Sequence, residues 1–262
     1  AFREVYSNRN IKIMSLTVII STFFRSCYRP FWTLFLYKEL GFTIELVALL
    51  HTIQTAENLL FSLPGGVLAD RIGRKKVTLI AGLTGVINPI IYLTATTWEP
   101  IFIATILVAM GSLGTPAHTA MIAESLPRNR MGTGYAVYNM ANRLPGLFSG
   151  AVGGLIMEVF ELGPGTRLCI VGVLIGHVIS YIARYLFLDE TLIRKSRASV
   201  FKDLNEILPE FKGSLRVLMV SSIIFQISSS LTSGLLSLYI MDYPTVPRLT
   251  KAQYGLLTTI MS

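Results

Sequence analysis

Three ionisable side chains lie near the middle of long apolar stretches of this sequence, where charged residues are costly. Arg25, Glu57 and Arg143 each have mostly apolar neighbours on both sides. A guanidinium group offers paired hydrogen bonds to a carboxylate or another oxyanion. A carboxyl group in apolar surroundings can take up and release a proton. The three residues therefore predict anion binding, with Glu57 as the candidate carrier of a coupling proton; any coupling would use a proton or ion gradient.

Polar residues accompany these positions at the spacing of one helix face. The stripes are Ser21, Arg25, Arg29 and Thr33; His51, Gln54, Thr55, Asn58 and Ser62; Tyr135, Tyr138, Asn139, Asn142 and Arg143; and Ser222, Gln226, Ser229, Ser230, Ser233 and Ser237. The predicted substrate-binding residues are Arg25, Arg29, Glu57, Asn58, Asn139, Asn142, Arg143 and Gln226. The stretches 77–97 and 167–188 are plainer, and Arg184 is close enough to the end of its stretch to snorkel outward.

The composition indicates that lipid is the solvent for most of the chain. Of the 262 residues, 52% are hydrophobic and 15% are charged, and the mean hydropathy is +0.58. A soluble domain carries about 25% charged residues, and a helix needs about 20 mostly apolar residues to cross a bilayer. Such stretches fall at 11–37, 44–69, 77–97, 100–123, 131–158, 167–188 and 216–241, and another begins near 251. We therefore predict an all-α membrane protein, in which Cys27 and Cys169 are packed thiols.

Basic residues are concentrated on one side of these predicted spans. Fifteen lysines and arginines lie on the side of the N-terminus, and four lie on the opposite side. The positive-inside rule therefore predicts a multi-pass protein of the cell membrane with a cytoplasmic N-terminus. The formal net charge of +8 is then a consequence of topology, and no nucleic-acid partner is expected.

The longest connection, at 191–215, separates a first unit at 1–190 from a second unit that begins at 216–262. Apolar residues recur in it at helical spacing, which predicts an amphipathic helix on the membrane surface; a partner-binding helix is the alternative. The segments 43–53 and 250–260 align without gaps and share five of eleven residues. A six-helix unit is therefore predicted to start again as a parallel repeat.

The turn between the second and third predicted spans carries the most specific motif of the chain. Gly65-Gly-Val-Leu-Ala-Asp-Arg-Ile-Gly-Arg-Lys-Lys76 resembles the signature of the major facilitator superfamily (MFS), Gly-x-Leu-Ala-Asp-Arg-x-Gly-Arg-Lys. The resemblance implies the MFS fold of twelve helices, of which this truncated chain holds a six-helix N-terminal bundle, helix 7 and the start of helix 8. It also implies a secondary active transporter that works by alternating access, with spans three and six outside the central cavity.

The same resemblance implies a cluster of charges that latches the cytoplasmic side of the protein. The residues of this gating motif are Gly66, Asp70, Arg71, Gly73, Arg74, Glu124 and Arg130. Independently of the resemblance, Gly66 near a helix end permits close helix approach, and Gly73 allows a tight reversal of the chain. Simple turn chemistry combined with orientation charge is the alternative interpretation.

The balance of charge within the spans favours an anionic or carboxylate-bearing substrate. Glu57 alone cannot neutralise Arg25, Arg29 and Arg143 together. Alternatively, the arginines pair with Glu57, with the backbone or with residues of the second unit. A drug-like efflux substrate is the alternative to an anionic one. A non-transporting membrane sensor or scaffold is the alternative function. No enzyme, cofactor or metal site is expected, because no nucleotide-binding loop, nucleophile motif or metal-ligand cluster occurs.

Overall fold

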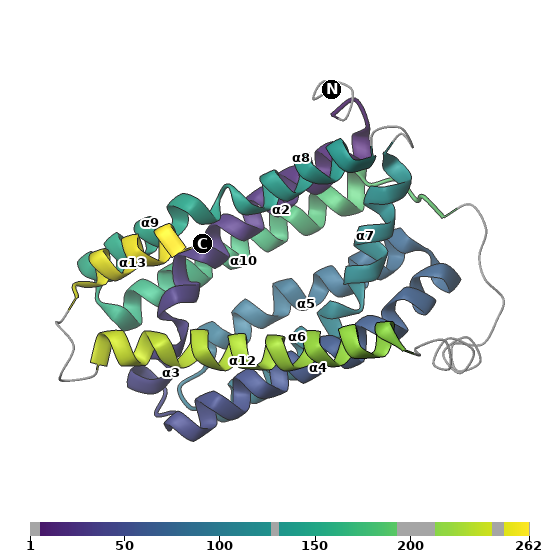
Figure 1. Cartoon of the computed structure of the whole chain (residues 1–262). Helices are drawn as coiled ribbons and strands as arrows, with labels where there is room; N and C mark the ends of the chain where they lie inside the picture. Colours follow the sequence, from purple (N-terminus) through teal and green to yellow (C-terminus); the bar gives the residue numbers. More distant parts are fainter. Residues whose placement is uncertain (1–5, 127–130, 193–212, 243–248, 262) are drawn as a thin grey trace.

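The computed structural model describes residues 6–126, 131–192, 213–242 and 249–261, and within them the chain is helical without strands (Figure 1). The elements are α2 (Arg9–Tyr28), the short 3-10 helix η1 (Arg29–Phe31), α3 (Trp32–Glu39), α4 (Ile44–Ile72), α5 (Arg74–Thr94), α6 (Glu99–Ser112), α7 (Gly114–Ser125), α8 (Met131–Arg143), α9 (Gly146–Phe160), α10 (Leu162–Phe187), α12 (Ser214–Asp242) and α13 (Lys251–Met261). The predicted spans are confirmed as helices. The amphipathic helix predicted at 191–215 lies almost entirely outside the described residues.

Side-chain caps and one glycine set several helix ends. Thr43 Oγ1 accepts a hydrogen bond from the backbone N–H of Leu46 at 3.3 Å where α4 begins. Thr250 Oγ1 accepts in the same way from Gln253 at 3.2 Å where α13 begins. These two threonines are aligned in the sequence repeat, so both aligned segments start their helices alike. α4 ends at Gly73, whose φ of 110° is strained for any residue with a side chain.

Three of the predicted spans are broken rather than continuous. The first passes from α2 to α3 through η1, which contains Pro30. The fourth passes from α6 to α7 at Leu113, and the fifth passes from α8 to α9 next to Pro145. Proline lacks the backbone N–H that a helix needs and clashes with the preceding turn, which explains two of these breaks. Each break allows one span to change direction within the bundle.

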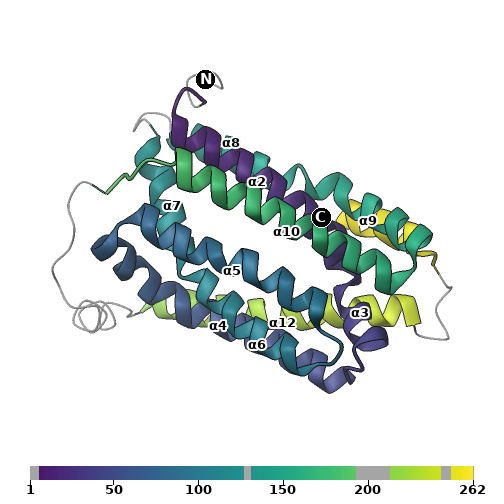
Figure 2. The ribbon, with the colours of Figure 1, turned by 180° about the vertical axis from the view of Figure 1, so that it is seen from behind.

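The helices form two layers (Figure 1, and Figure 2 from behind). One layer contains α2, α8, α9, α10 and α13, with α2 packed on α10 and α9, and α13 on α9. The other contains α4, α5, α6 and α12, with α4 packed on α6 and α12, and α5 on α6. α3 carries the first span into the second layer, and α7 connects the layers at the end that holds the N-terminus. We call this end the motif end, because the turn at Gly73 lies there.

Buried apolar clusters close both ends of the bundle. Phe35 and Leu50 belong to a cluster of α3, α4, α5 and α6 at the end opposite the motif end. Met121 belongs to a second cluster, of α2, α7 and α8, at the motif end. Cys27 and Cys169 are free and buried in a third cluster, as the sequence predicts. Between the two ends, the layers are in contact where α5 packs on α10.

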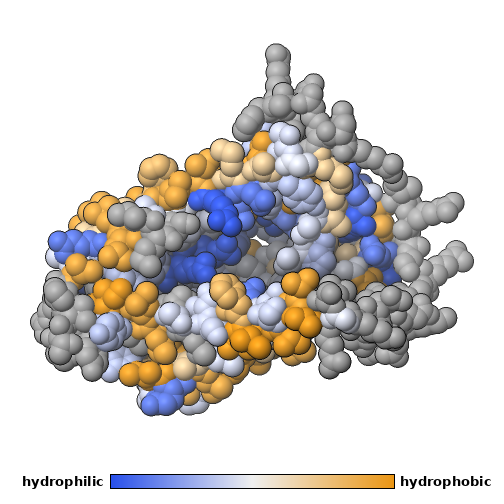
Figure 3. Space-filling model, viewed as in Figure 1, coloured by the Kyte–Doolittle hydropathy of each residue, from blue (hydrophilic) through white to orange (hydrophobic). Residues whose placement is uncertain are grey.

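Apolar side chains cover the outside of the layers. Phe148, Val159 and Phe225 are among the most exposed of them. Figure 3 shows hydrophobic residues on the outer faces and hydrophilic residues around a hollow in the middle. Within the described ranges, five helical segments are long and apolar enough to cross a membrane. They are Arg9–Glu39, Arg74–Thr94, Glu99–Ser125, Met131–Phe160 and Leu162–Phe187. The protein is therefore a membrane protein whose outer surface faces lipid.

Candidate substrate-binding cavity

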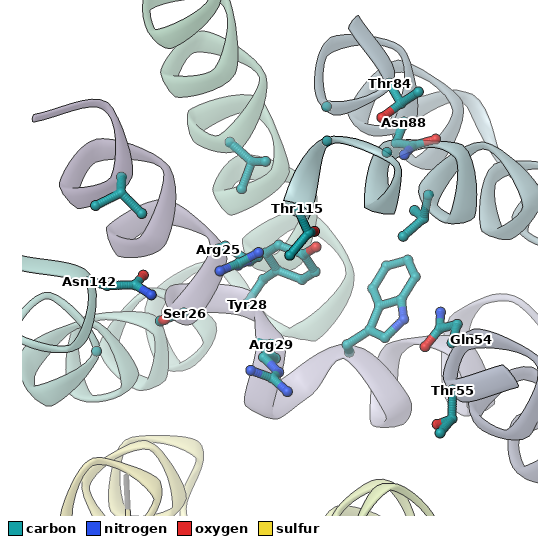
Figure 4. Close-up of a pocket in the computed structure, with 18 of the residues that line it drawn as sticks. Arg25, Ser26, Tyr28, Arg29, Gln54, Thr55, Thr84, Asn88, Thr115 and Asn142 are labelled. Atoms are coloured by element: carbon teal, nitrogen blue, oxygen red, sulfur yellow. The ribbon is translucent and has the colours of Figure 1, made fainter. Parts of the chain in front are cut away.

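A cavity of about 2120 Å³ lies between the two layers, and residues of both layers line it. Its lining combines aromatic rings, such as Trp32 and Tyr92, with hydroxyl and amide groups, such as Thr84 and Asn142. Figure 4 shows several of these side chains around the open space. Small-molecule sites in proteins have this form, with apolar walls and a few convergent polar groups.

The charged residues that line the cavity are all basic. Arg25 and Arg29 come from α2 and η1, and Arg184 comes from α10. Three histidines line it as well: His51, His118 and His177. Among the described lining residues there is no aspartate or glutamate. The wall is thus cationic, which favours an anion beside it.

Arg25 and Arg29 lie one helical turn apart and both face the cavity. Their side chains are exposed, and Figure 4 shows them in the open space beside Tyr28. They are close enough to repel each other electrostatically. Neither forms a salt bridge with a carboxylate of the described residues. The pair is therefore held in place by the backbone, without a counter-charge from the described chain.

Neutral polar groups surround the two arginines. Asn142 Oδ1 of α8 accepts a hydrogen bond from Thr22 Oγ1 of α2 at 3.0 Å. This bond orients the amide and does not use its N–H₂ group. In the other layer, Thr33 Oγ1 and His51 Nε2 lie 3.3 Å apart. These bonds position polar side chains at the wall without adding negative charge.

Five of the eight substrate-binding residues predicted from the sequence line the cavity: Arg25, Arg29, Asn139, Asn142 and Gln226. Glu57 and Arg143 are not among its lining residues, and the side chain of Asn58 lies outside the described part of the chain. The three charged residues of the apolar stretches therefore do not meet at the cavity wall. The roles of all eight residues in binding stay predictions.

Glu57 of α4 is partly buried and is not among the lining residues of the cavity. It is two helical turns from Leu50, which is fully buried, whereas His51, Gln54 and Thr55 on the adjacent face line the cavity. The Oε2 atom of Glu57 is buried and has no hydrogen-bond partner among the described residues. Among the described residues it forms no salt bridge with an arginine, so the alternative in which the cavity arginines pair with Glu57 gains no support from the structure.

The sequence interpretation missed lining residues of α5 and α10. The family resemblance placed these two spans outside the cavity, yet α5 contributes Thr84 and Asn88, and α10 contributes His177 and Arg184. Arg184 does not snorkel outward, because its Nε donates a hydrogen bond to Thr17 Oγ1 at 3.0 Å inside the bundle. A signal was present in the sequence: His177 and Arg184 are about two turns apart and so share one face of their helix.

The gating motif forms a charge network at the motif end. Arg74, the first residue of α5, forms a salt bridge with Asp70 of α4 at 3.2 Å and another with Glu124 of α7. The Arg74 side chain is only 14% exposed, so these carboxylates offset the cost of its burial. Arg130 lies outside the described residues. Three helices that are distant in the sequence are therefore tied together by one guanidinium group.

Glu190, which the sequence interpretation did not single out, completes this network. Its two carboxylate oxygens accept hydrogen bonds from the backbone N–H groups of Arg74 and Lys75 at 3.1 and 3.2 Å. The first N–H groups of a helix have no partner within the helix, and a carboxylate there also interacts favourably with the helix dipole. Glu190 thus caps α5 and joins the chain after α10 to the gating motif.

Close helix approach at the motif end occurs at Gly65, and not at Gly66 as expected. A Cβ atom on Gly65 would clash with the backbone of Leu113, at the break between α6 and α7. A Cβ atom on Gly66 would lie 3.6 Å from the Pro116 side chain, which is an ordinary contact. The difference arises because neighbouring residues on a helix point about 100° apart.

Residues 14–262 match the family model of the Major Facilitator Superfamily. The chain belongs to this superfamily. Its motif-end network and its central cavity are thus parts of an MFS fold, and this family and fold are those of membrane transporters.

Two curated relatives of the chain are named as an MFS-type transporter and as an antiporter. An uncharacterized MFS-type transporter, YhjO, of Bacillus subtilis (strain 168) is 30% identical over 132 residues, which are 49% of this chain and 32% of the relative. A Na(+), Li(+), K(+)/H(+) antiporter of Planococcus maritimus is 26% identical over 195 residues, which are 71% of this chain and 43% of the relative. The matches therefore cover less than half of either relative.

Solved structures of peptide transporters share the fold. A POT family transporter in complex with a thioalcohol-conjugated peptide has a TM-score of 0.67 at 15% identity, over 97% of this chain and 67% of that chain. A peptide transporter POT in complex with sulfate has a TM-score of 0.68 at 16% identity, over 97% and 66%. At these identities the likeness concerns the MFS fold alone.

Proposed function

We propose that this chain forms the N-terminal six-helix bundle and the start of the C-terminal bundle of a secondary transporter, which moves a small anionic solute across the cell membrane by alternating access. The observation that carries the proposal is the cavity wall, where three arginines and three histidines line the space and no described lining residue is acidic. In this proposal the motif end faces the cytoplasm, as the positive-inside rule predicts.

The adjacent arginines favour an anion over a neutral or cationic solute. Arg25 and Arg29 repel each other. An anion between them would be attracted to both and would offset this repulsion. A carboxylate can accept two parallel hydrogen bonds from one guanidinium group. Asn142 lies on the neighbouring helix and can add a neutral donor (Figure 4). A cation would increase the repulsion, and a neutral solute would leave both arginines without a counter-charge.

Glu57 is the proposed carrier of a coupling proton or ion. Its buried Oε2 lacks a partner among the described residues, and ionisable groups within membrane spans commonly serve such relays. The relative from Planococcus maritimus is named as a Na(+), Li(+), K(+)/H(+) antiporter, which supports coupling to a cation gradient. Because Glu57 is separate from the cavity wall, substrate and coupling ion would use different groups.

Uptake by the full-length carrier in proteoliposomes tests the proposal. The vesicles receive small carboxylates, the corresponding neutral amides and amines of the same size. We expect uptake of the carboxylates, and a loss of roughly 10- to 150-fold in Arg25→Ala, because hydrogen bonds to charged groups contribute about 1.5–3 kcal/mol. Lys12→Ala is the matched control, since Lys12 is an exposed cation of the same helix outside the cavity lining.

Two results would contradict the proposal. Equal uptake of carboxylates and amides, or normal uptake by Arg25→Ala with normal membrane insertion, would remove the cationic wall from substrate binding. Absence of uptake for all three classes, with specific binding retained, would favour the alternative of a non-transporting membrane sensor or scaffold.

A further inference from the structure

Arg184 provides a second cationic position in the cavity, nearer the motif end than Arg25. Its Nε donates a hydrogen bond to Thr17 Oγ1 at 3.0 Å, while Thr17 Oγ1 donates to the Met14 carbonyl at 3.1 Å. Ser180 donates to the Thr17 carbonyl at 3.2 Å, so α2 and α10 are tied together at this point. No described carboxylate forms a salt bridge with Arg184. The guanidinium is thus fixed through Nε, with its terminal amino groups available to a ligand.

His118 and Tyr138 line the same cavity as Arg184. Both interact with Arg184 electrostatically, and the Tyr138 hydroxyl lies 3.4 Å from His118 Nδ1. When the hydroxyl donates to Nδ1, the neutral imidazole carries its proton on Nε2 and becomes a donor. His118 Nε2 is buried and has no partner among the described residues. A buried donor without an acceptor is unfavourable, so the cluster is suited to an oxyanion.

The two cationic positions are well separated along the cavity. Arg25 lies eight residues beyond Thr17 on α2, which corresponds to about 12 Å along the helix at about 1.5 Å per residue. His177 lines the same cavity and is within electrostatic range of both Arg25 and Arg184. One carboxylate is too small to contact both arginines, whereas an elongated molecule with an anionic group at each end can do so.

We propose that Arg184, His118 and Tyr138 form a second anion-binding subsite, so that the cavity selects an elongated solute with two anionic ends, such as an α,ω-dicarboxylate. One end binds Arg25 and Arg29, and the other binds Arg184 and His118. This inference rests on the proposed transport of an anionic solute, and it adds the number and spacing of the charges.

Binding of a graded series of α,ω-dicarboxylates to the purified full-length carrier tests this subsite. The series runs from malonate to sebacate, each with a monocarboxylate of matched length, and affinity is measured by calorimetry and by thermal stabilisation. We expect one chain length to bind best, at least tenfold more tightly than its matched monocarboxylate. Arg184→Gln should lower dicarboxylate affinity about tenfold, to the monocarboxylate level, and leave monocarboxylate affinity unchanged. Arg184→Lys should recover part of the loss.

Control variants distinguish a ligand contact from a loss of structure. Arg167→Gln removes a cation from the same helix, where Arg167 donates to the carbonyls of Leu93 and Ala95 outside the cavity lining, and should keep the preference for two charges. If Arg184→Gln does not fold, His118→Phe provides the second test. It should lower dicarboxylate affinity severalfold without changing monocarboxylate affinity.

The outcomes separate failure of the subsite from failure of the proposed function. Equal binding of dicarboxylates and monocarboxylates by the unmodified carrier would overturn the subsite, as would equal weakening of both classes by Arg184→Gln. In either case, loss of monocarboxylate binding in Arg25→Ala would leave anion transport supported. If no anion in the series depends on Arg25, both the subsite and the proposed anionic substrate are wrong.

Discussion

The motif end and the cavity wall both contain arginines, but only the arginine of the motif end has carboxylate partners among the described residues. At the motif end, Arg74 is shielded from water and bonded to the carboxylates of Asp70 and Glu124. At the cavity wall, Arg25 and Arg29 are accessible and have no carboxylate partner in the described chain. In the first arrangement the protein itself supplies the carboxylates, and in the second no described residue supplies one.

This difference separates an arginine that holds helices together from one that is available to a ligand. A paired, largely buried arginine costs several kcal/mol to unpair, so it behaves as a fixed cross-link or as a latch. An arginine without a partner in a cavity keeps its full attraction for an incoming anion. Whether a carboxylate lies beside an arginine therefore predicts its role. A paired arginine links helices, and an arginine without a partner is available to a ligand.

The largest effect should follow from giving the cavity the carboxylate that it lacks. Asn142→Asp keeps the acceptor for Thr22 and nearly the same shape, and it introduces a negative charge opposite Arg25 (Figure 4). We expect anion affinity to fall roughly 10- to 100-fold, because the new carboxylate competes for the arginines and repels the solute. Calorimetry on the full-length carrier measures this change.

A matched control places the same charge on the same helix outside the cavity lining. Thr133→Asp does so at an exposed position of α8 near the motif end, and anion affinity should stay within about twofold of the unmodified carrier. Unchanged affinity in Asn142→Asp would show that the cavity arginines do not bind the solute, and the comparison with Arg74 would lose its functional meaning.

The sequence predicted the fold and part of the site, because these depend on local patterns. Apolar stretches of sufficient length define the helices, and the repeat at Thr43 and Thr250 has the same helix cap twice. Stripes on α2, α4 and α8 identified Arg25 and Asn142, because residues one turn apart share a face wherever the helix packs.

The rest of the candidate site depends on which face of each helix packs against which neighbouring helix, and a single sequence does not predict this. Glu57 was assigned to the cavity from its depth in the membrane, yet it is not among the lining residues that the structure shows. Arg184 was assigned to the interface, yet α10 is turned so that this residue bonds Thr17. Glu190 was missed because its partners are backbone N–H groups, which leave no mark in the sequence.

An intermediate effect is expected from weakening the motif-end network. Glu124→Gln removes one of the two carboxylates that neutralise Arg74. If the network is a latch, the balance between inward-facing and outward-facing states should shift, and the maximal uptake rate should change roughly five- to tenfold, for a loss of about 1–1.4 kcal/mol. The KM for the anion should stay within about twofold, whereas Arg25 variants should raise KM. Uptake kinetics in proteoliposomes separate these two patterns.

Glu99→Gln provides the control for this change, since Glu99 is an exposed carboxylate at the start of α6, at the opposite end of the bundle. It should leave both kinetic constants unaltered. A change in KM without a change in rate for Glu124→Gln would place this carboxylate in substrate binding and remove the distinction between the two regions.

The smallest effect should come from Glu190, which contacts backbone N–H groups and forms no salt bridge with an arginine of the described residues. Glu190→Gln keeps an oxygen acceptor for the N-terminus of α5 but removes the negative charge near Arg74 and Lys75. Loss of a charged helix cap costs about 1 kcal/mol, which corresponds to a fall of about 2–4 °C in Tm. Asp189→Asn changes the neighbouring exposed carboxylate, which lies 4.0 Å from Arg9, and should shift Tm by less than about 1 °C. Because Glu190 is remote from the cavity lining, anion affinity should not change; a large loss of affinity in Glu190→Gln would mean that the motif end and the cavity wall are one coupled unit rather than two.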